Sequence, residues 1–379
     1  MAKLKVLILG AGFGGLEVAA RLSEGAPEQV DVTVIDQSDA FVFGFSKLDV
    51  MFGRTTLRRV RARYAELQKA AVTFRQERVV VIDPVARQVV TDRGSHRADV
   101  LVVGLGADLD PAATPGLVEG GYEFYSEAGA QRLAGVLPSF TGGHAVIGVM
   151  GTPYKCPPAP SETALMLHDY LTARGHRRAT RISVVSPLGT PVPPSPETSR
   201  ALLDAFAERD ITYLGGTTVT RLEPGRGTAV LHDGAELDVD LFLGVPLHRV
   251  PDVVAESGLC VGGWVGVNPH TLATSFPRVY ALGDVANAPV PRAGVFAETA
   301  ARVVAEQILA ELRGGDVSAY DGYGTCYIEF GSGRVARVEI TFITLSGPRG
   351  GPFAPPSMDL AREKEEFAST RLRRWFGRP

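Results

Sequence analysis

A glycine-rich turn near the N-terminus constrains this chain more than any other feature. An apolar run, Lys3–Leu9, leads into Gly10-Ala11-Gly12-Phe13-Gly14-Gly15, and the residues that follow have apolar side chains at helical spacing. A second apolar run ends at Asp36, 21 residues after Gly15. A strand, glycine turn, helix and strand in this order form a parallel unit that helices must cover on both faces. We therefore expect an α/β fold that binds a dinucleotide at this turn.

The residue types in the turn suit a pyrophosphate group. Gly10 allows the tight turn, Gly12 lets the backbone approach the phosphates, and Gly15 lets the helix pack closely on the strand. Free N–H groups at the helix N-terminus favour negative charge. Asp36 is placed to accept hydrogen bonds from ribose hydroxyls, and its charge argues against a 2′-phosphate. The turn alone does not separate FAD from NAD.

A second motif favours FAD. The segment Tyr280-Ala281-Leu282-Gly283-Asp284 resembles the second FAD fingerprint of the two-dinucleotide-binding flavoproteins. This resemblance implies that Asp284 binds the ribitol chain and that a helix starting at Gly294 directs its N-terminus at the flavin pyrimidine. The cofactor residues expected from both motifs and from two weaker matches, near the pyrophosphate and the adenine, are Gly10, Gly12, Phe13, Gly14, Gly15, Asp36, Gln37, Val79, Gly106, Ala107, Gly283, Asp284, Gly294 and Val295.

With 379 residues, the chain is longer than one typical domain. We expect two interleaved Rossmann-like domains of the glutathione-reductase type and a small C-terminal α+β segment. Residues 1–110 and 245–315 would form the discontinuous FAD-binding domain, and residues 111–244 the second Rossmann-like domain. Residues 316–379 would form the C-terminal segment with an amphipathic helix over Asp359–Phe376. We also expect a helix over Leu57–Lys69.

The second domain lacks the glycine fingerprint that binds NAD(P)H in reductases of this superfamily. Its first strand is followed by Met150-Gly151-Thr152-Pro153-Tyr154-Lys155-Cys156 and three further prolines by residue 160, which oppose an immediate phosphate-binding helix. The next strand ends at Ser186-Pro187, without a carboxylate for a ribose. The sequence therefore predicts an electron donor other than a nicotinamide.

Two cysteines suggest what that donor is. Cys156-Pro157-Pro158 resembles the active-site loop of flavocytochrome c sulfide dehydrogenases and, more loosely, of sulfide:quinone oxidoreductases, and Thr325-Cys326-Tyr327 stands where these families have a second cysteine. The resemblance, from Lys3 to about residue 345, implies a redox-active pair of Cys156 and Cys326 beside the flavin. This pair would oxidise sulfide, a persulfide or a thiol, and pass electrons to a quinone or a small electron carrier.

The environment of Cys156 suggests how its thiolate would form. We expect the following helix N-terminus and Lys155 to lower the pKa of the Cys156 thiol. Glu162 is placed to move protons during sulfur transfer. The alternative for Glu162 is a first-turn carboxylate that only opposes the helix dipole. Cys260 is expected to be an ordinary small apolar residue.

The chain departs from the resembled families in three ways. Residues 1–155 contain no cysteine, whereas the membrane-bound sulfide:quinone enzymes usually have a third essential one. Flavocytochromes attach FAD through a cysteine in the region of Ala40–Val50, which has none here, so we expect non-covalent FAD. The sequence shows neither an export signal nor a C-x-x-C-H haem motif, which predicts a cytoplasmic protein.

Charge and patterning limit the partners. The net charge is −3 without a long basic block, which gives no support for nucleic acid, and the seven histidines lack metal-ligand spacing. The C-terminal helix leaves open a weak peripheral contact at the inner membrane face. We favour the alternative, in which its apolar face docks on the protein body or on a second subunit of a homodimer. Two functional alternatives remain: a type II NADH:quinone dehydrogenase-like flavoenzyme and a non-catalytic FAD-binding partner protein.

Overall fold

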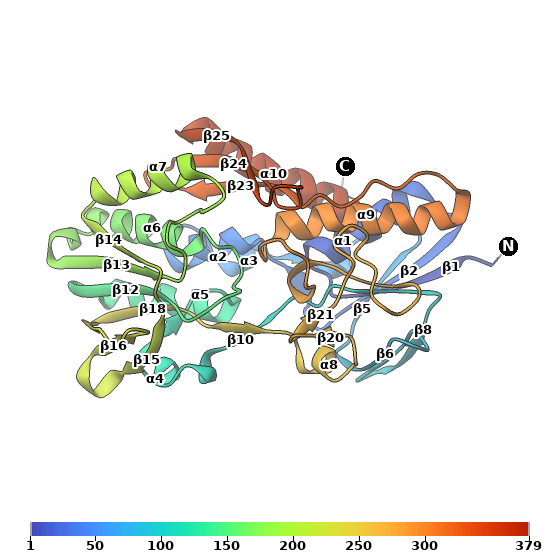
Figure 1. The fold of residues 1–379 in the computed structure, drawn as a ribbon, viewed down its shortest axis with the longest axis horizontal. Coiled ribbons are helices and arrows are strands. Elements are labelled where there is room, and N and C mark those ends of the chain that lie inside the picture. Colours follow the sequence, from blue (N-terminus) through green and yellow to red (C-terminus); the bar gives the residue numbers. More distant parts are fainter. Residues whose placement is uncertain (1, 378–379) are drawn as a thin grey trace.

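A computed structural model describes residues 2–377 as two α/β lobes side by side, with a third layer across both (Figure 1). The first lobe contains a five-stranded sheet in the order β22-β9-β1-β2-β5, in which every pair is parallel. These strands are β1 (Leu4–Leu9), β2 (Val30–Asp36), β5 (Val72–Gln76), β9 (Val100–Val103) and β22 (Val279–Ala281). The order places a strand from late in the chain beside the N-terminal ones, so this lobe is discontinuous in the sequence.

Helices α1 (Phe13–Gly25) and α9 (Gly294–Arg313) pack together on one face of this sheet, where buried alanines allow close approach. A small antiparallel sheet packs on the other face through Ile82 and Val89. It consists of β6 (Val79–Asp83), β7 (Gln88–Thr91) and β8 (Gly94–Arg97). The short elements β20 (Cys260–Val261), β21 (Trp264–Val265) and α8 (Asp252–Ala255) lie beside it.

The second lobe repeats the parallel arrangement with the order β11-β18-β12-β13-β14. Its strands are β11 (Tyr122–Glu123), β12 (Gly143–Val149), β13 (Thr180–Ser186), β14 (Ile211–Gly215) and β18 (Leu241–Val245). Its helices are α4 (Leu117–Gly120), α5 (Glu127–Val136), α6 (Ala159–Ala173) and α7 (Pro196–Ala207). An antiparallel meander, expected from the alternating pattern, consists of β15 (Val219–Glu223), β16 (Thr228–Leu231) and β17 (Glu236–Asp238). The predicted fold class is confirmed.

Two antiparallel segments, β10 (Asp108–Asp110) and β19 (Leu247–Arg249), connect the lobes. The third layer consists of β23 (Tyr323–Glu329), β24 (Val335–Thr341), β25 (Arg349–Ser357) and helix α10 (Met358–Phe376), and it lies over both lobes (Figure 1). This arrangement brings residues from the C-terminal part of the chain to the region between the lobes.

Helix α10 docks on the first lobe. Trp375 and Phe376 are fully buried, and the Trp375 indole N–H donates to Glu17 Oε2 of α1 at 2.7 Å. The Arg374 guanidinium donates to both Glu17 oxygens at 3.0 and 2.8 Å. The apolar end of this helix thus packs in the core of the first lobe, in agreement with the favoured interpretation. Within residues 2–377, no helix has the length and apolar character needed to cross a membrane.

The helix expected over Leu57–Lys69 is wrong in its extent. Only α3 (Leu57–Val60) is helical, and the chain then forms β4 (Ala62–Arg63), which pairs with β3 (Ala40–Phe41). The cause is tertiary, because the hydroxyl of buried Tyr64 donates to the Ala11 carbonyl at 2.7 Å and its ring packs against Phe74. A helix α2 (Gly44–Met51), which the sequence did not suggest, precedes this segment.

Candidate active site

The glycine turn opens onto a cavity. Gly10 has φ +95°, and a Cβ there would lie 2.3 Å from the Gly104 carbonyl oxygen. A Cβ on Gly15 would lie 1.9 Å from the Gly10 carbonyl oxygen, so both positions exclude a side chain for reasons of packing. A Cβ on Gly12 would meet no protein atom within 4 Å. Gly12 therefore presents bare backbone to open space, which is what a phosphate group needs.

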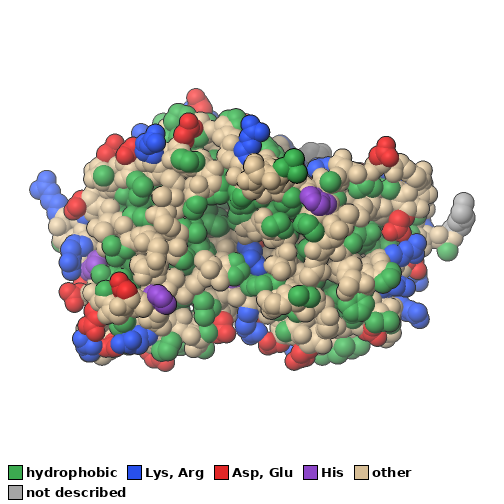
Figure 2. Space-filling view, viewed as in Figure 1, with side chains coloured by type: hydrophobic (Ala, Val, Ile, Leu, Met, Phe, Trp, Pro, Cys, Tyr) green, Lys and Arg blue, Asp and Glu red, His purple; other side chains and the backbone are tan. Residues whose placement is uncertain are grey.

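This cavity, of about 440 Å³, lies between the lobes. Figure 2 shows the hollow, with apolar side chains along its rim and Lys or Arg side chains inside it. The expected cofactor residues that line it are Gly12, Phe13, Gly14, Asp36, Gly106, Gly283, Asp284 and Gly294. Asp36 Oδ2 accepts from the Ala11 N–H at 2.8 Å, which holds the acid against the turn. Both motifs thus face one space, and the N-terminus of α9 opens onto it.

The other expected cofactor residues lie outside this lining. Gln37 is exposed at the end of β2, and Val79 lies in β6 and packs against the core beneath the sheet. The Ala107 carbonyl accepts from Lys155 Nζ at 2.7 Å. Val295 lines a neighbouring apolar cavity. Roles for these residues in binding the cofactor stay predictions.

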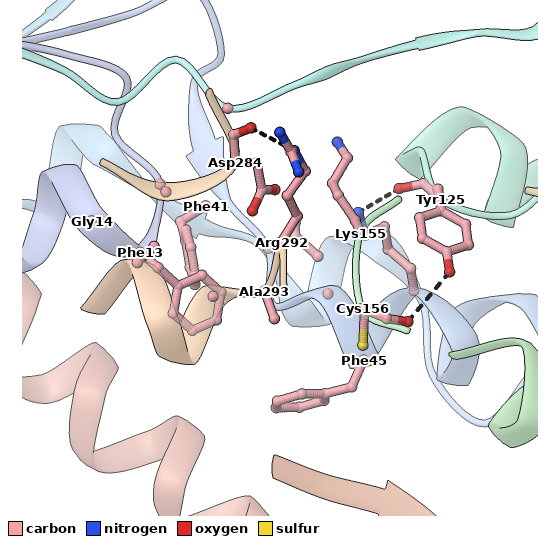
Figure 3. Close-up of a pocket in the computed structure, with 18 of the residues that line it drawn as sticks. Phe13, Gly14, Phe41, Phe45, Tyr125, Lys155, Cys156, Asp284, Arg292 and Ala293 are labelled. Carbon is pink, nitrogen blue, oxygen red and sulfur yellow. Dashed lines mark hydrogen bonds between the residues drawn. The ribbon is translucent and has the colours of Figure 1, made fainter. Parts of the chain in front are cut away.

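Three cations line this cavity although the sequence did not predict them as cofactor residues. They are Lys47, Lys155 and Arg292. Lys47 Nζ donates to the Tyr125 carbonyl at 2.5 Å, and burial, with a contribution from Lys155, lowers the Lys47 pKa to about 8. Figure 3 shows Arg292 beside Asp284, where the guanidinium donates to the Asp284 carbonyl at 2.9 Å. No motif marks these positions, because they meet only in the folded chain.

The charges of Arg292 and Asp284 oppose each other in this cavity. Arg292 stacks on the Trp264 ring at 3.6 Å, and burial lowers its pKa to about 10. Burial raises the pKa of the Asp284 carboxyl, while Lys155 and Arg292 oppose that rise. Bare glycine backbone, a helix N-terminus and this mixture of one acid with several cations fit a cofactor that carries phosphates, hydroxyls and a redox ring.

Cys156 and Cys326 line the same apolar cavity, of about 360 Å³, although 170 residues separate them. Cys156 lies in the loop between β12 and α6, and Cys326 lies on β23. Both are free thiols. The Cys156 sulfur points toward Phe45 (Figure 3), into the cavity, so its surface is accessible even though protein surrounds it. The third layer therefore supplies one of the two sulfurs and the second lobe supplies the other.

The expected low pKa of Cys156 is wrong in direction. Burial, reinforced by the nearby Glu162 carboxylate, raises the pKa of the Cys156 thiol well above its usual value. The same causes raise the pKa of Cys326 to about 12. The Lys155 ammonium, expected to help, instead reaches away to the Ala107 carbonyl. As free thiols, both side chains hold their protons at neutral pH.

Glu162 lies in the first turn of α6 and is only 3% exposed. Its Oε1 accepts from the Glu329 N–H at 3.0 Å, and burial raises its pKa to about 7. Glu162 lines both the cavity at the glycine turn and the apolar cavity, as Cys156 does. The hydrogen bond supports a structural role, while a pKa near neutrality suits proton transfer.

A buried ion pair lies behind this acid. Lys364 of α10 donates to Glu329 at 2.7 Å, and its ammonium lies 4.6 Å from the centroid of the Phe45 ring. Lys364 and Glu329 are 6% and 7% exposed. The sequence alone does not reveal this pair, because Lys364 stands in a helix of strongly mixed charge, where a lysine is ordinarily solvated.

A discontinuous parallel-sheet lobe with two motifs facing one cavity, and a second such lobe inserted within it, define a flavoprotein with two dinucleotide-binding-type domains. The chain belongs to the pyridine nucleotide-disulphide oxidoreductase family, whose model matches residues 4–305. Members of this family are FAD-binding flavoproteins, so the prediction of FAD as the cofactor is confirmed. The predicted enzyme class, an FAD-dependent oxidoreductase, agrees with this family.

Several relatives within this family are sulfide:quinone oxidoreductases. The mitochondrial sulfide:quinone oxidoreductase of Mus musculus is 26% identical over 364 residues, which cover 89% of this chain and 78% of that protein. The sulfide-quinone reductase of Aquifex aeolicus is 27% identical over 342 residues, covering 83% of this chain and 77% of that protein. The X-ray structure of the sulfide:quinone oxidoreductase from Aquifex aeolicus superposes with a TM-score of 0.89 at 23% identity, covering 100% of this chain and 93% of that one. The predicted resemblance to these enzymes is confirmed.

Proposed function

We propose that this protein is an FAD-dependent oxidoreductase that oxidises sulfide, a persulfide or a thiol through Cys156 and Cys326 and delivers the electrons to a quinone or a small electron carrier. The observation that carries this proposal is the shared wall of the two cavities. Cys156 and Glu162 line both of them, and Cys326 lines the apolar one. The similarity to sulfide:quinone oxidoreductases over 89% of the chain supports the same substrate class.

The two cysteines perform the sulfur chemistry. Starting from their disulfide, a sulfide anion attacks one sulfur and breaks the S–S bond, which leaves a persulfide on one cysteine and a thiolate on the other. A second sulfide anion removes the outer sulfur as a disulfide anion, and the thiolate takes up a proton, so both cysteines are now thiols. Re-forming the disulfide releases two protons and two electrons. FAD, when bound, supplies the acceptor for that electron pair.

The raised thiol pKa values create a need for a base. Because burial disfavours both thiolates, the reduced pair must lose its protons before its electrons can pass to the flavin. Glu162 is the acid that touches both cavities, and with a pKa of about 7 it can take a proton and release it at neutral pH. We therefore assign proton transfer to Glu162, in addition to its hydrogen bond with the Glu329 N–H.

The apolar cavity suits a quinone ring. Its wall includes Val338, Ile340 and Phe342 from the third layer and Phe367 from α10. A flat apolar acceptor would bury its ring against these side chains. Because quinones lie in membranes, a quinone acceptor requires that this protein, which we propose is cytoplasmic, contacts the inner face of the membrane peripherally.

The second lobe argues against NADH as the donor. The segment after β13, where a nucleotide ribose would lie, is a proline-rich loop fixed by hydrogen bonds. The Tyr213 hydroxyl donates to the Leu188 carbonyl at 2.8 Å, and the Val192 N–H donates to Ser199 Oγ at 3.0 Å. Pro191 and Pro194 of this loop line the cysteine cavity instead. A closed loop of this kind leaves no carboxylate for a ribose.

The test is anaerobic flavin absorbance after mixing with sulfide or with NADH in parallel. We expect sulfide to bleach the flavin of the wild-type protein and of C260S, because Cys260 lies on β20 and packs against the core of the first lobe. We expect C156S and C326S to lose at least about 100-fold in the rate of bleaching, as when a covalent catalyst is removed. Bleaching by NADH alone would move the protein to the NADH dehydrogenase alternative. Tight FAD without reduction by NADH, sulfide or thiols would indicate a non-catalytic partner protein.

A further inference from the structure

The loop that carries Cys156 follows a strand of the second lobe, yet its hydrogen bonds reach the connections between the lobes. Lys155 Nζ donates to the Ala107 carbonyl, just before β10, at 2.7 Å. The Lys155 backbone N–H donates to His248 Nε2 on β19 at 3.3 Å. The Cys156 N–H donates to the Arg292 carbonyl, just before α9, at 2.7 Å. Two consecutive residues are therefore tied to both connecting segments and to the first lobe.

Cys156 needs these ties because its backbone is strained. Its φ is 46°, in the left-handed region that disfavours residues other than glycine. Pro157 follows, and a residue before proline prefers an extended backbone. Such a conformation persists only where the surroundings fix it, and such outliers gather at functional sites. Without its ties, Cys156 would relax toward the extended region and its sulfur would leave its present direction.

His248 has one tautomer that suits this task. Its Nδ1 lies 2.9 Å from the Pro246 carbonyl, which only accepts, so Nδ1 carries the hydrogen and Nε2 is free to accept from Lys155. Burial, reinforced by the Lys155 ammonium, lowers the His248 pKa to about 4, so the ring stays neutral at physiological pH. The ring also packs edge-on against Tyr125 at 5.7 Å, and the Tyr125 hydroxyl lies 3.5 Å from the Cys156 carbonyl.

We propose that His248 is a positioning residue for the reactive sulfur. By accepting from the Lys155 N–H, it latches the loop to the connection between the lobes and holds Cys156 left-handed, with its thiol directed into the cavity that Cys326 and Glu162 also line. This inference rests on the proposed function, because a fixed direction matters only if Cys156 forms and breaks a disulfide with Cys326. Neither sequence motif includes His248, which stands 92 residues after Cys156.

The test measures how accessible and reactive the Cys156 thiol is, independently of turnover. The reduced holoenzyme is alkylated with iodoacetamide between pH 6 and pH 10, and modification of each cysteine is followed by mass spectrometry, with Cys260 as the internal reference. H248F keeps an aromatic ring but has no acceptor. H248Q keeps an acceptor near the position of Nε2. H232F replaces an exposed histidine remote from the loop and is the matched control.

In H248F we expect Cys156 to react about two- to tenfold faster than in the wild type, the range given by one lost hydrogen bond. Its apparent pKa should fall, because the released thiol reaches water. H248Q should stay within about twofold of the wild type, and H232F should not differ from it. Equal rates and pH profiles in H248F and the wild type would overturn the proposal. So would an equal acceleration in H248Q, since the acceptor would then be irrelevant.

A second variant decides the matter if H248F does not fold or retain FAD. H248N keeps a polar side chain, but that side chain is too short to reach the Lys155 N–H. It should speed alkylation of Cys156 as H248F does, so a rate at or below that of the wild type overturns the proposal. Flavin bleaching by sulfide, measured on the same samples, tests the proposed function separately. If sulfide does not bleach the flavin of the wild-type protein but the alkylation rate of Cys156 still depends on His248, the proposed function is refuted. The positioning role of His248 is then retained.

Discussion

The buried carboxyl of Glu162 makes the stability of this protein depend on pH in an unusual direction. Its pKa is about 7 in the folded protein, against about 4.5 for a solvated glutamate. Between these values the folded state binds more protons than the unfolded state, so stability falls as pH rises. The gap of about 2.5 corresponds to roughly 3 kcal/mol at about 1.4 kcal/mol per pH unit. That stability is present below pH 4.5 and fully lost above pH 7.

The substitution E162Q removes this dependence. Glutamine keeps an oxygen for the Glu329 N–H but does not ionise, so the variant should gain about 2 kcal/mol over the wild type between pH 5.5 and pH 8. Urea unfolding of both proteins at the two pH values, followed by circular dichroism, measures this gain. E256Q, at an exposed position, is the control and should track the wild type. The same gain in E256Q, or none in E162Q, would refute the assignment of a buried, titrating Glu162.

Three further predictions concern the glycine turn, the docking of α10 and the surroundings of Glu162. Without FAD, G12A should unfold at the same urea concentration as the wild type, because its Cβ meets nothing within 4 Å. It should bind FAD at least about tenfold more weakly by fluorescence titration, and an unchanged affinity would contradict the role of Gly12 in binding the phosphates. W375F should lose about 1–3 kcal/mol in urea unfolding, since buried Glu17 loses a donor, and a loss below about 0.5 would show that the α10 contact contributes little. K364M should raise the Glu162 pKa above about 7, seen as an infrared carboxyl band that persists to higher pH, because the Lys364 charge lowers that pKa; a lower pKa would contradict this arrangement.

The sequence was sufficient for features that depend on local pattern. The glycine turn, the acid at the end of β2 and the Gly283-Asp284 motif are short, and each of them carries its geometry within a few residues. The alternation of strands and helices predicted both lobes and the meander for the same reason. The pairing of Cys156 with Cys326 across one cavity came from resemblance, not from spacing.

The remaining site residues depend on packing between distant segments. Lys47, Arg292 and Lys364 come from α2, the loop before α9, and α10, and nothing near them in sequence distinguishes them from solvated cations. The wrong direction for the pKa of Cys156 has the same origin. The helix start and Lys155 are visible in sequence, whereas the burial that outweighs them is a property of the folded cavity.

The strand order of the first lobe has a consequence for synthesis. β22 and α9, which complete the sheet and place a helix N-terminus at the cavity, lie at residues 279–313, and Cys326 follows them. A nascent chain that has emerged only as far as the second lobe therefore has the glycine turn but an incomplete cofactor cradle and a single cavity sulfur. During synthesis, the complete cradle and both sulfurs are therefore available only after residue 326 has left the ribosome.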